Sequence, residues 1–322
     1  MPPRAIDVHA HALSPKLVEL TAAHGGPPNP HNEHLMETRY RAPFTSLDVR
    51  LETMDRQGID MQVVSHMPNF AYWAEHDLAL RVVEAANTLI AELCQARPDR
   101  FIGLGLVALQ FPELAARQTE EAMNAFGMRG VEIGTFVEGM ELGDDRLEPF
   151  WANAERLGAL VFLHPAGSTL GGRLSKYYLS NVIGNPLDTT IALTHLIFSG
   201  VLERHPNLKI VAAHGGGYLP SYFPRTIHGF EVRPEAQTIP QPPDYYLKQL
   251  WVDALVYDPR NVAHVVERMG SSRVLLGTDY PFDMGEEQPL EVLAAVPGLS
   301  DADRQRIKVD NALELLGMAV AV

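Results

Sequence analysis

The sequence predicts an α/β protein whose fold is a (β/α)8 (TIM) barrel with a small insertion after the first strand. Eight apolar segments alternate with segments of helical periodicity, and short motifs rich in His and Asp follow the carboxyl ends of several strands. Nearly continuous runs of Val, Ile and Leu are typical of parallel strands that are buried on both faces. An open doubly wound sheet is the alternative architecture.

The expected strands follow one another at intervals that leave room for helices. They are residues 5–9, 61–65, 101–109, 130–134, 160–164, 209–213, 250–255 and 273–277. Helical periodicity occurs at 46–57, 78–96, 113–126, 149–156, 186–199 and 261–269, and a closing helix is expected at 302–316. The whole chain, 1–322, is therefore predicted to form one barrel domain.

Two segments are longer than ordinary loops. Segment 13–44 contains Gly-Gly-Pro-Pro-Asn-Pro at 25–30, and we expect it to form an insertion or lid above the first strand. Its histidines, His24, His31 and His34, have no strand beneath them and are expected to be solvated or part of the lid. Segment 233–244 is a Pro-rich excursion after the sixth strand.

Composition excludes several classes of function. The formal net charge of -14, without a dense run of Lys and Arg, excludes a nucleic-acid partner or an anionic membrane surface. No apolar run reaches the length of about 18 residues expected of a membrane span, and no leader pattern precedes the first strand. The only cysteine, Cys94, has no partner for a disulfide and is expected in the core. We therefore expect a cytoplasmic protein.

Four potential metal ligands follow three of the expected strands. Side chains alternate along a strand, so His9 and His11 point to the same side, which in a barrel can be the interior. His164 ends the fifth strand, and Asp279 follows the eighth, which lies beside the first when the ring closes. Neutral imidazoles with a carboxylate suit Zn²⁺ and leave a position open for water or substrate. These residues predict a catalytic metal site.

His214 ends the sixth strand and has two alternative roles. It could be a ligand of a second metal ion, or it could act as the acid–base group beside a single ion, because imidazole titrates near neutral pH. A two-metal barrel usually needs a bridging group on the fourth strand, where Glu132 is the available carboxylate and no lysine is present. We favour one metal ion per chain, with His214 in proton transfer.

Motifs along nearly the whole chain resemble those of the amidohydrolase superfamily, and more narrowly of its metal-dependent decarboxylase branch. They include Asp-Val-Arg at 48–50, Gly-Val-Glu-Ile-Gly-Thr at 130–135, Ala-His-Gly-Gly-Gly at 213–217, Asp-Ala-Leu-Val at 253–256 and Gly-Thr-Asp-Tyr-Pro-Phe at 277–282. The resemblance implies a carboxy-lyase that removes carbon dioxide without oxidation. The implied substrate is a small anionic carboxylate, either a carboxymuconate semialdehyde or a carboxylated aromatic acid.

The resemblance also implies roles for the site residues. One Zn²⁺ per chain, or Mn²⁺ or Co²⁺ in its place, is held by His9, His11, His164 and Asp279. The implied catalytic residues are His214 and Asp279. The implied substrate-binding residues are Arg50, Arg225, Tyr178 and Phe282, with Arg225 contributed across the interface of a homodimer.

Tyr178 departs from the family pattern, which has a tryptophan at this position after Lys-Tyr. Tyrosine is smaller and adds a hydroxyl, so the pocket is expected to favour a related or more polar substrate. Because a fold and a metal site do not determine the reaction, a metal-dependent hydrolase or hydratase on the same barrel is the alternative function. A non-enzymatic metal-binding protein is least favoured, since structural zinc sites rarely lie at an open barrel rim.

Overall fold

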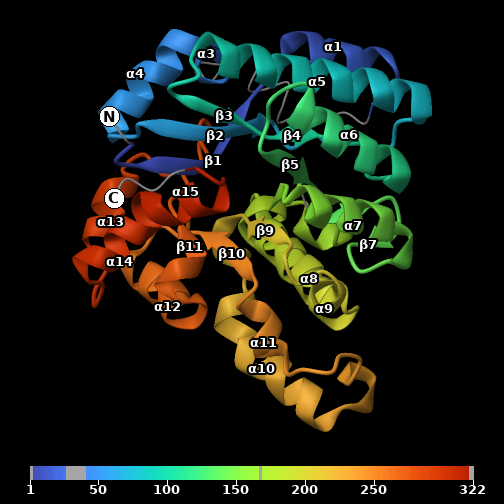
Figure 1. The fold of residues 1–322 in the computed structure, drawn as a ribbon, viewed down its shortest axis with the longest axis vertical. Helices are drawn as coiled ribbons and strands as arrows, with labels where there is room; N and C mark the ends of the chain where they lie inside the picture. The colour runs from blue at the N-terminus through green and yellow to red at the C-terminus, as the bar shows by residue number, and fades with distance from the viewer. Residues whose placement is uncertain (1–2, 27–40, 167–168, 319–322) are drawn as a thin grey trace.

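The computed structural model describes residues 3–26, 41–166 and 169–318 and consists of a ring of parallel strands surrounded by helices (Figure 1). The strands of the ring are β1 (Ile6–Ala12), β2 (Met61–His66), β3 (Phe101–Gly103), β4 (Gly105–Leu106), β5 (Gly130–Ile133), β8 (Leu160–Leu163), β9 (Lys209–Ala212), β10 (Leu250–Asp253) and β11 (Val274–Leu275). A short hairpin, β6 (Phe136–Val137) and β7 (Met140–Glu141), follows β5. The predicted (β/α)8 barrel is confirmed.

The third expected strand, at 101–109, is shorter than predicted and is divided into β3 and β4. β3 pairs with β2, and β4 pairs with β5, so this divided strand joins the two halves of the ring. The remaining pairs follow in the order β5-β8-β9-β10-β11, all parallel. The eight predicted strand positions are therefore all occupied.

Backbone hydrogen bonds close the ring between β1 and the chain that follows β11. The amide of Val8 donates to the carbonyl of Leu276 at 2.9 Å, and the amide of Asp279 donates to the carbonyl of His9 at 2.8 Å. The amide of His11 donates to Tyr280 at 2.7 Å. We call this junction the seam. It places Asp279 beside the first strand, as the barrel topology predicts.

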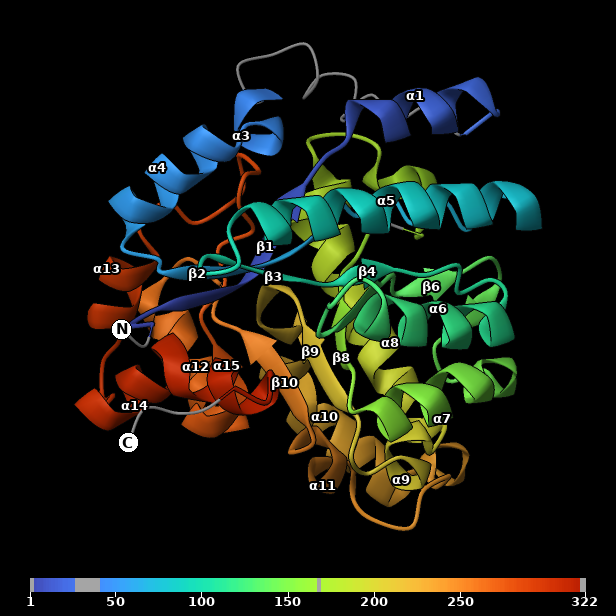
Figure 2. The same cartoon turned by 45° about the horizontal axis from the view of Figure 1, so that its top comes forward.

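Helices cover the outside of the ring, as Figures 1 and 2 show from two directions. They are α1 (Pro15–Ala23), α3 (Arg41–Thr45), α4 (Leu47–Gln57), α5 (His76–Ala96), α6 (Pro112–Asn124), α7 (Glu148–Leu157), α8 (Asn185–Phe198), α9 (Val201–Arg204), α10 (Leu219–Val232), α11 (Pro243–Leu247), α12 (Pro259–Met269), α13 (Pro289–Ala294), α14 (Asp301–Gln305) and α15 (Asn311–Leu315). Each helix expected from periodicity is present, with ends that differ by a few residues. Ser46 caps α4 by accepting from the amide of Val49, and Gly58 ends it in a left-handed conformation.

The structure adds helices that the sequence pattern did not predict. α10 follows β9, and in Figure 1 it extends with α11 away from the ring. The expected Pro-rich excursion contains a 3-10 turn (Pro234–Ala236) and the start of α11. The closing helix is interrupted by a π-helical turn (Arg306–Asp310) between α14 and α15. No helix in the described part of the chain is long and apolar enough to cross a membrane.

The expected insertion at 13–44 is described only in part. α1 lies beside α5, and α3 leads into α4 (Figure 2). His24 is exposed, as expected, and its Nδ1 lies 2.9 Å from the carbonyl oxygen of Leu20. Residues 27–40, which include His31 and His34, lie outside the described residues. The lid role of this segment stays a prediction.

The interior of the ring contains an apolar layer closed at one end by the last helices. Its members are Ile6, Val8, Met61, Val63, Ile102, Leu104, Leu160, Phe162, Val211, Ala213, Leu275, Val309, Ala312, Leu313, Leu315 and Leu316. A second and larger apolar cluster includes buried residues of the strands and of the outer helices, and Cys94 packs against it. The interior is thus a packed core and not a pore, as is usual for this fold.

Strand β1 changes the direction of its side chains between its two halves. Its regular pairing with β2 is interrupted between Asp7 and Ala10. Val8 belongs to the interior cluster, whereas Ala10 belongs to the outer one. An irregularity of this kind reverses which side chains face the two sides of a sheet. His9 consequently packs against the interior residue Phe162, with ring centroids 4.9 Å apart, and lies above the apolar layer.

Asp7 stabilises the seam by accepting four hydrogen bonds while fully buried. Its donors are the amide and hydroxyl of Thr278, at 3.0 and 2.6 Å, the amide of His9, at 3.0 Å, and Nε2 of Gln62, at 3.0 Å.

We predict that Asp7→Ala lowers the free energy of unfolding by about 3 kcal/mol, because these buried donors lose their acceptor. Denaturant titration measures the loss. Asp301→Ala, at an exposed carboxylate, should change the midpoint little, and an equal effect of both substitutions would contradict the prediction.

Candidate metal centre

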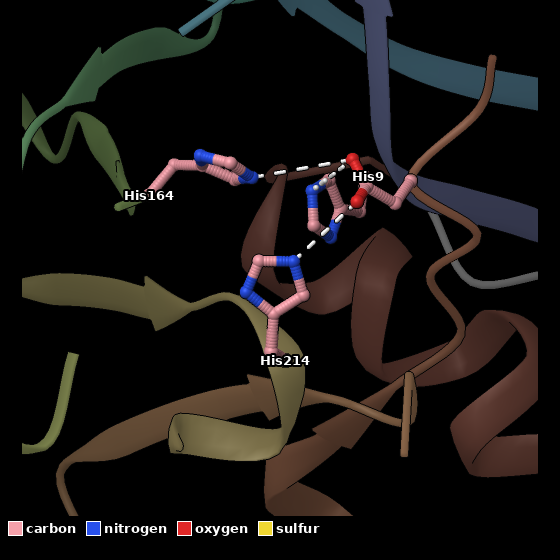
Figure 3. Close-up of side chains that lie close together, drawn as sticks. His9, His164 and His214 are labelled. Atoms are coloured by element: carbon pink, nitrogen blue, oxygen red, sulfur yellow. Dashed lines mark hydrogen bonds and ion pairs between the residues drawn. The ribbon is translucent and has the colours of Figure 1, made fainter. Parts of the chain in front are cut away.

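The four predicted ligands meet above the apolar layer. His9 and His11 are fully buried, and the Nε2 atom of each lies 3.2 Å from Oδ1 of Asp279. His164 directly follows β8, and its Nε2 lies 4.0 Å from the same oxygen. Figure 3 shows the rings of His9 and His164 directed toward one point. Two strands, β1 and β8, and the seam therefore bring three imidazoles to one carboxylate.

The chemistry of these atoms fits a divalent metal ion. Nε2 of each of the three histidines and Oδ1 of Asp279 are buried and have no hydrogen-bond partner among the described residues. Burial lowers the pKa of His11 and of His164, which favours the neutral ring that binds metal. Burial opposes ionisation of His9 as well, but the carboxylates of Asp279 and Asp253 raise its pKa to about 10. Burial opposes ionisation of Asp279, but the surrounding histidines hold its pKa well below the usual value. Buried polar atoms left without partners are costly, and a cation bound between them would satisfy all four.

His214 approaches the cluster from the other side of the carboxylate. It follows β9 in a 3-10 turn (His214–Gly216), and its Nε2 lies 3.4 Å from Oδ2 of Asp279 (Figure 3). The three other histidines face Oδ1. His9, His164, His214 and Asp279 nevertheless have ligand atoms within 4.8 Å of one another, so His214 is also close enough to bind a metal ion. Both roles considered for His214 are compatible with this geometry.

Asp253, at the end of β10, orients two of these histidines. Its Oδ2 lies 2.7 Å from Nδ1 of His9, which leaves Nε2 of that ring toward Asp279. The same carboxylate accepts from the amides of His214, at 3.0 Å, and Gly215, at 2.9 Å. The sequence analysis assigned no role to Asp253, although its position at the end of the seventh strand could have indicated that it lies near the histidines. Such partners fix the tautomer and direction of metal-binding histidines.

Glu132, considered above as a bridge between two ions, is fully enclosed. Its Oε1 lies 3.8 Å from Nδ1 of His11, a nitrogen that is also 3.1 Å from the Ser65 hydroxyl. Burial raises the pKa of Glu132 well above the ordinary carboxyl value, which favours its protonated form. Among the described residues, the group whose ligand atoms lie within 4.8 Å of one another consists of His9, His164, His214 and Asp279 and includes neither Glu132 nor His11. Both Glu132 oxygens are also buried without a hydrogen-bond partner among the described residues, so one metal ion per chain stays a prediction.

A cavity of about 280 Å³ opens beside the cluster. Its lining includes His164, His214 and Asp279, together with Tyr178 and Phe282. The Phe282 ring lies 5.4 Å from that of His11, measured between centroids. The structure thus brings two of the four expected substrate-binding residues to the same cavity, and their contact with substrate stays a prediction.

The two expected arginines lie elsewhere in the described chain. Arg50 is buried, and its guanidinium donates to the carbonyl of His11 and, at 3.1 Å, to Oε1 of Gln62. It also lies 4.8 Å from the centre of the Tyr280 ring, so in this structure it supports β1 and the seam. Arg225 is exposed on α10. Neither residue lines the cavity as described, and their binding of carboxylates stays a prediction.

We predict that Asp253→Ala lowers the affinity for a divalent metal ion by about 10- to 100-fold, because His9 loses the acceptor that orients its ring. Competition with a chromophoric chelator measures the affinity. Asp258→Ala is the matched control, since among the described residues the Asp258 side chain bonds only to the start of α12, as with Arg260. An unchanged affinity in the Asp253 variant would contradict this role.

Comparison with known proteins supports the fold and identifies the family. A family model described as "Amidohydrolase" matches residues 6–318. The chain is 38% identical over 274 residues to 2-amino-3-carboxymuconate-6-semialdehyde decarboxylase of Dictyostelium discoideum, covering 84% of this chain and 76% of the relative. It is 28% identical over 286 residues to gamma-resorcylate decarboxylase of Rhodococcus jostii, covering 83% of this chain and 86% of the relative.

A solved structure with the same fold is that of 5-carboxyvanillate decarboxylase from Novosphingobium aromaticivorans, in complex with manganese and 4-hydroxy-3-methoxy-5-nitrobenzoic acid. The TM-score is 0.85 at 22% sequence identity, with 98% of this chain and 97% of that chain covered. This likeness supports the (β/α)8 architecture. Because the family model spans nearly the whole sequence and a relative at 38% identity covers most of it, the chain belongs to the amidohydrolase family.

Proposed function

We propose that this protein is a metal-dependent, non-oxidative decarboxylase of a small carboxylate. The substrate is 2-amino-3-carboxymuconate-6-semialdehyde, a compound like it, or a carboxylated aromatic acid, as the names of the relatives suggest. One observation carries the proposal: the unpaired donor atoms of three histidines and Asp279 converge beside a cavity that His214 also lines. A carboxylate in that cavity would lie next to both a cation and a proton carrier.

The ion is proposed to be one Zn²⁺ per chain, with Mn²⁺ or Co²⁺ as alternatives, held by His9, His11, His164 and Asp279. When bound, it supplies a Lewis acid that withdraws electron density from a substrate oxygen. Loss of carbon dioxide breaks a carbon–carbon bond and leaves the electron pair on the substrate carbon, which must then gain a proton. The chain's own residues have to provide that proton and orient the substrate.

His214 and Asp279 are the proposed proton carriers. Their 3.4 Å separation, Nε2 to Oδ2, allows a proton to pass between them. On one route, His214 takes a proton from a water molecule, and the resulting hydroxide adds to the conjugated substrate. His214 then returns the proton to the carbon that bears the carboxylate, and carbon dioxide and the hydroxide leave together as the double bond re-forms. On the other, the carbon bearing the carboxylate is protonated directly, with Asp279 relaying the proton. Both routes use the same two side chains.

The cavity wall suits a flat, unsaturated acid. Tyr178 and Phe282 offer aromatic faces, while Met67 and Met284 add polarizable apolar surface. The cavity volume of about 280 Å³ is near the lower end for small-molecule sites, which favours a substrate with about one ring. A small aromatic or muconate-like acid fits these features.

The assembly is proposed to be a cytoplasmic homodimer. Arg225 is exposed on α10, and Tyr222 on the same helix is 67% exposed, so this helix offers charged and aromatic surface to a second copy. In the proposed dimer, Arg225 of one protomer binds a substrate carboxylate in the site of the other. Arg50 is proposed to act from within the same chain.

We predict that protein with one equivalent of metal releases carbon dioxide from at least one acid in a screen of aminocarboxymuconate semialdehyde, related muconates and hydroxybenzoates. The reaction is monitored by ultraviolet absorbance and by release of carbon dioxide.

His214→Ala should retain near-normal metal content but lose turnover by roughly 10²-fold or more, because an acid–base group is removed. His195→Ala, at a half-exposed histidine on α8, is the control.

Three results would count against this scheme. Loss of metal in His214→Ala would make that residue a ligand. Two metal equivalents per chain would contradict the single ion and favour a hydrolase or hydratase with Glu132 as a bridge. Absence of carbon dioxide release from every acid would reject decarboxylation.

The shared site is tested by mixing an Arg50→Ala chain with an Arg225→Ala chain. Each variant alone should be nearly inactive, whereas a mixed dimer should contain one intact site, giving about a quarter of wild-type activity after random reassortment. Because Arg50 also supports β1, the unfolding midpoint of its variant is measured in parallel. No recovery between two folded variants would contradict a site shared across the interface.

A further inference from the structure

Asn185 lies at the boundary of two cavities beside the predicted metal ligands. It is the first residue of α8, and it lines both the cavity of about 280 Å³ and a neighbouring cavity of about 360 Å³. His214 and Asp279 also line both cavities. A molecule held next to the metal ligands would therefore be within reach of the Asn185 amide.

The Asn185 side chain has an unused acceptor. The residue is 9% exposed, and its Oδ1 is buried without a hydrogen-bond partner in the part of the chain that the structure describes. An acceptor that is removed from water and left unpaired is destabilising, and such atoms in folded proteins often pair with a ligand or an ordered water. Asn185 contributes to the lining of a cavity that predicted metal ligands also line, and a molecule bound there is a possible source of the missing donor.

Local packing holds the backbone of Asn185 at a fixed place relative to the turn that contains His214. The carbonyl of Asn185 accepts from the hydroxyl of Thr189 at 3.0 Å. The turn that contains His214 packs directly against the same helix, because a Cβ atom at Gly217 would lie only 2.1 Å from the carbonyl oxygen of Pro186. A fixed acceptor can distinguish substrates more sharply than a mobile one.

We propose that Asn185 determines substrate specificity, with its Oδ1 accepting a hydrogen bond from a hydroxyl or amino group of the bound carboxylate. The proposal rests on the proposed function, since it assumes that a carboxylate occupies this cavity. Ser180 and Asn181, from the preceding π-helical turn (Ser180–Gly184), add polar groups to the same lining, while Phe282 adds an apolar face. The cavity therefore fits a planar acid that has a polar substituent directed at Asn185.

Binding of two matched acids tests this role without requiring turnover. The probes are 2,6-dihydroxybenzoate and 2,6-difluorobenzoate, because fluorine is close to hydroxyl in size but cannot donate a hydrogen. Calorimetry on metal-loaded protein gives the ratio of the two dissociation constants. Asn185→Leu should reduce the preference for the hydroxylated acid about tenfold, whereas Asn185→Asp keeps the acceptor and should preserve the ratio.

Asn261→Leu is the matched control, since this exposed asparagine lines only the larger cavity and should leave the ratio unchanged. Melting temperature and metal content report folding, and Asn185→Ala replaces the leucine variant if leucine prevents folding. The proposal would be overturned if the folded apolar variant kept the wild-type ratio of the two dissociation constants. It would also be overturned if Asn185→Asp lost the preference for the hydroxylated acid as strongly as Asn185→Leu, or if the wild-type protein bound neither acid. The proposed function is tested separately. It would be contradicted if no carbon dioxide were released even though the ratio of the two dissociation constants depended on Asn185.

Discussion

The seam between β1 and the chain after β11 is the constraint on which the rest of the site depends. Asp279 lies 270 residues after His9, and its amide bonds to the His9 carbonyl at 2.8 Å. Asp7 accepts from Thr278 and His9 together, so one buried carboxylate fixes both sides of the seam. Closing the barrel and assembling the cluster of histidines around Asp279 are therefore the same structural event.

The barrel interior contains both an apolar core and a group of buried polar side chains, which lie at different levels along the strands. Apolar residues such as Val8 and Phe162 fill one level, while His9 and His11 form a polar level above it. The irregular pairing between Asp7 and Ala10 lets a single strand contribute to both levels. Polar atoms that would destabilise a simple core are thereby placed where a cation could bind them.

The sequence was sufficient to predict the barrel and the convergence of the predicted ligands, because both follow from the order of the strands. A residue at the carboxyl end of a strand must lie at one rim, so His164 and Asp279 could be placed from their positions alone. Arg50 could not be placed this way, since its contact with the His11 carbonyl depends on how α4 packs against β1 and β2. The Asp253 contact depends on ring orientation, which periodicity does not determine.

Both proposed proton carriers have a strained backbone conformation. His214 has φ 55° and Asp279 has φ 59°, a region that non-glycine residues seldom occupy. Both residues are held by buried hydrogen bonds: Asp253 accepts from the His214 amide, and the His9 carbonyl accepts from the Asp279 amide. These bonds offset the strain and fix Nε2 and Oδ2 at 3.4 Å. The hydrogen bonds that hold the backbone of His214 and Asp279 thus support the geometry of the proposed proton transfer.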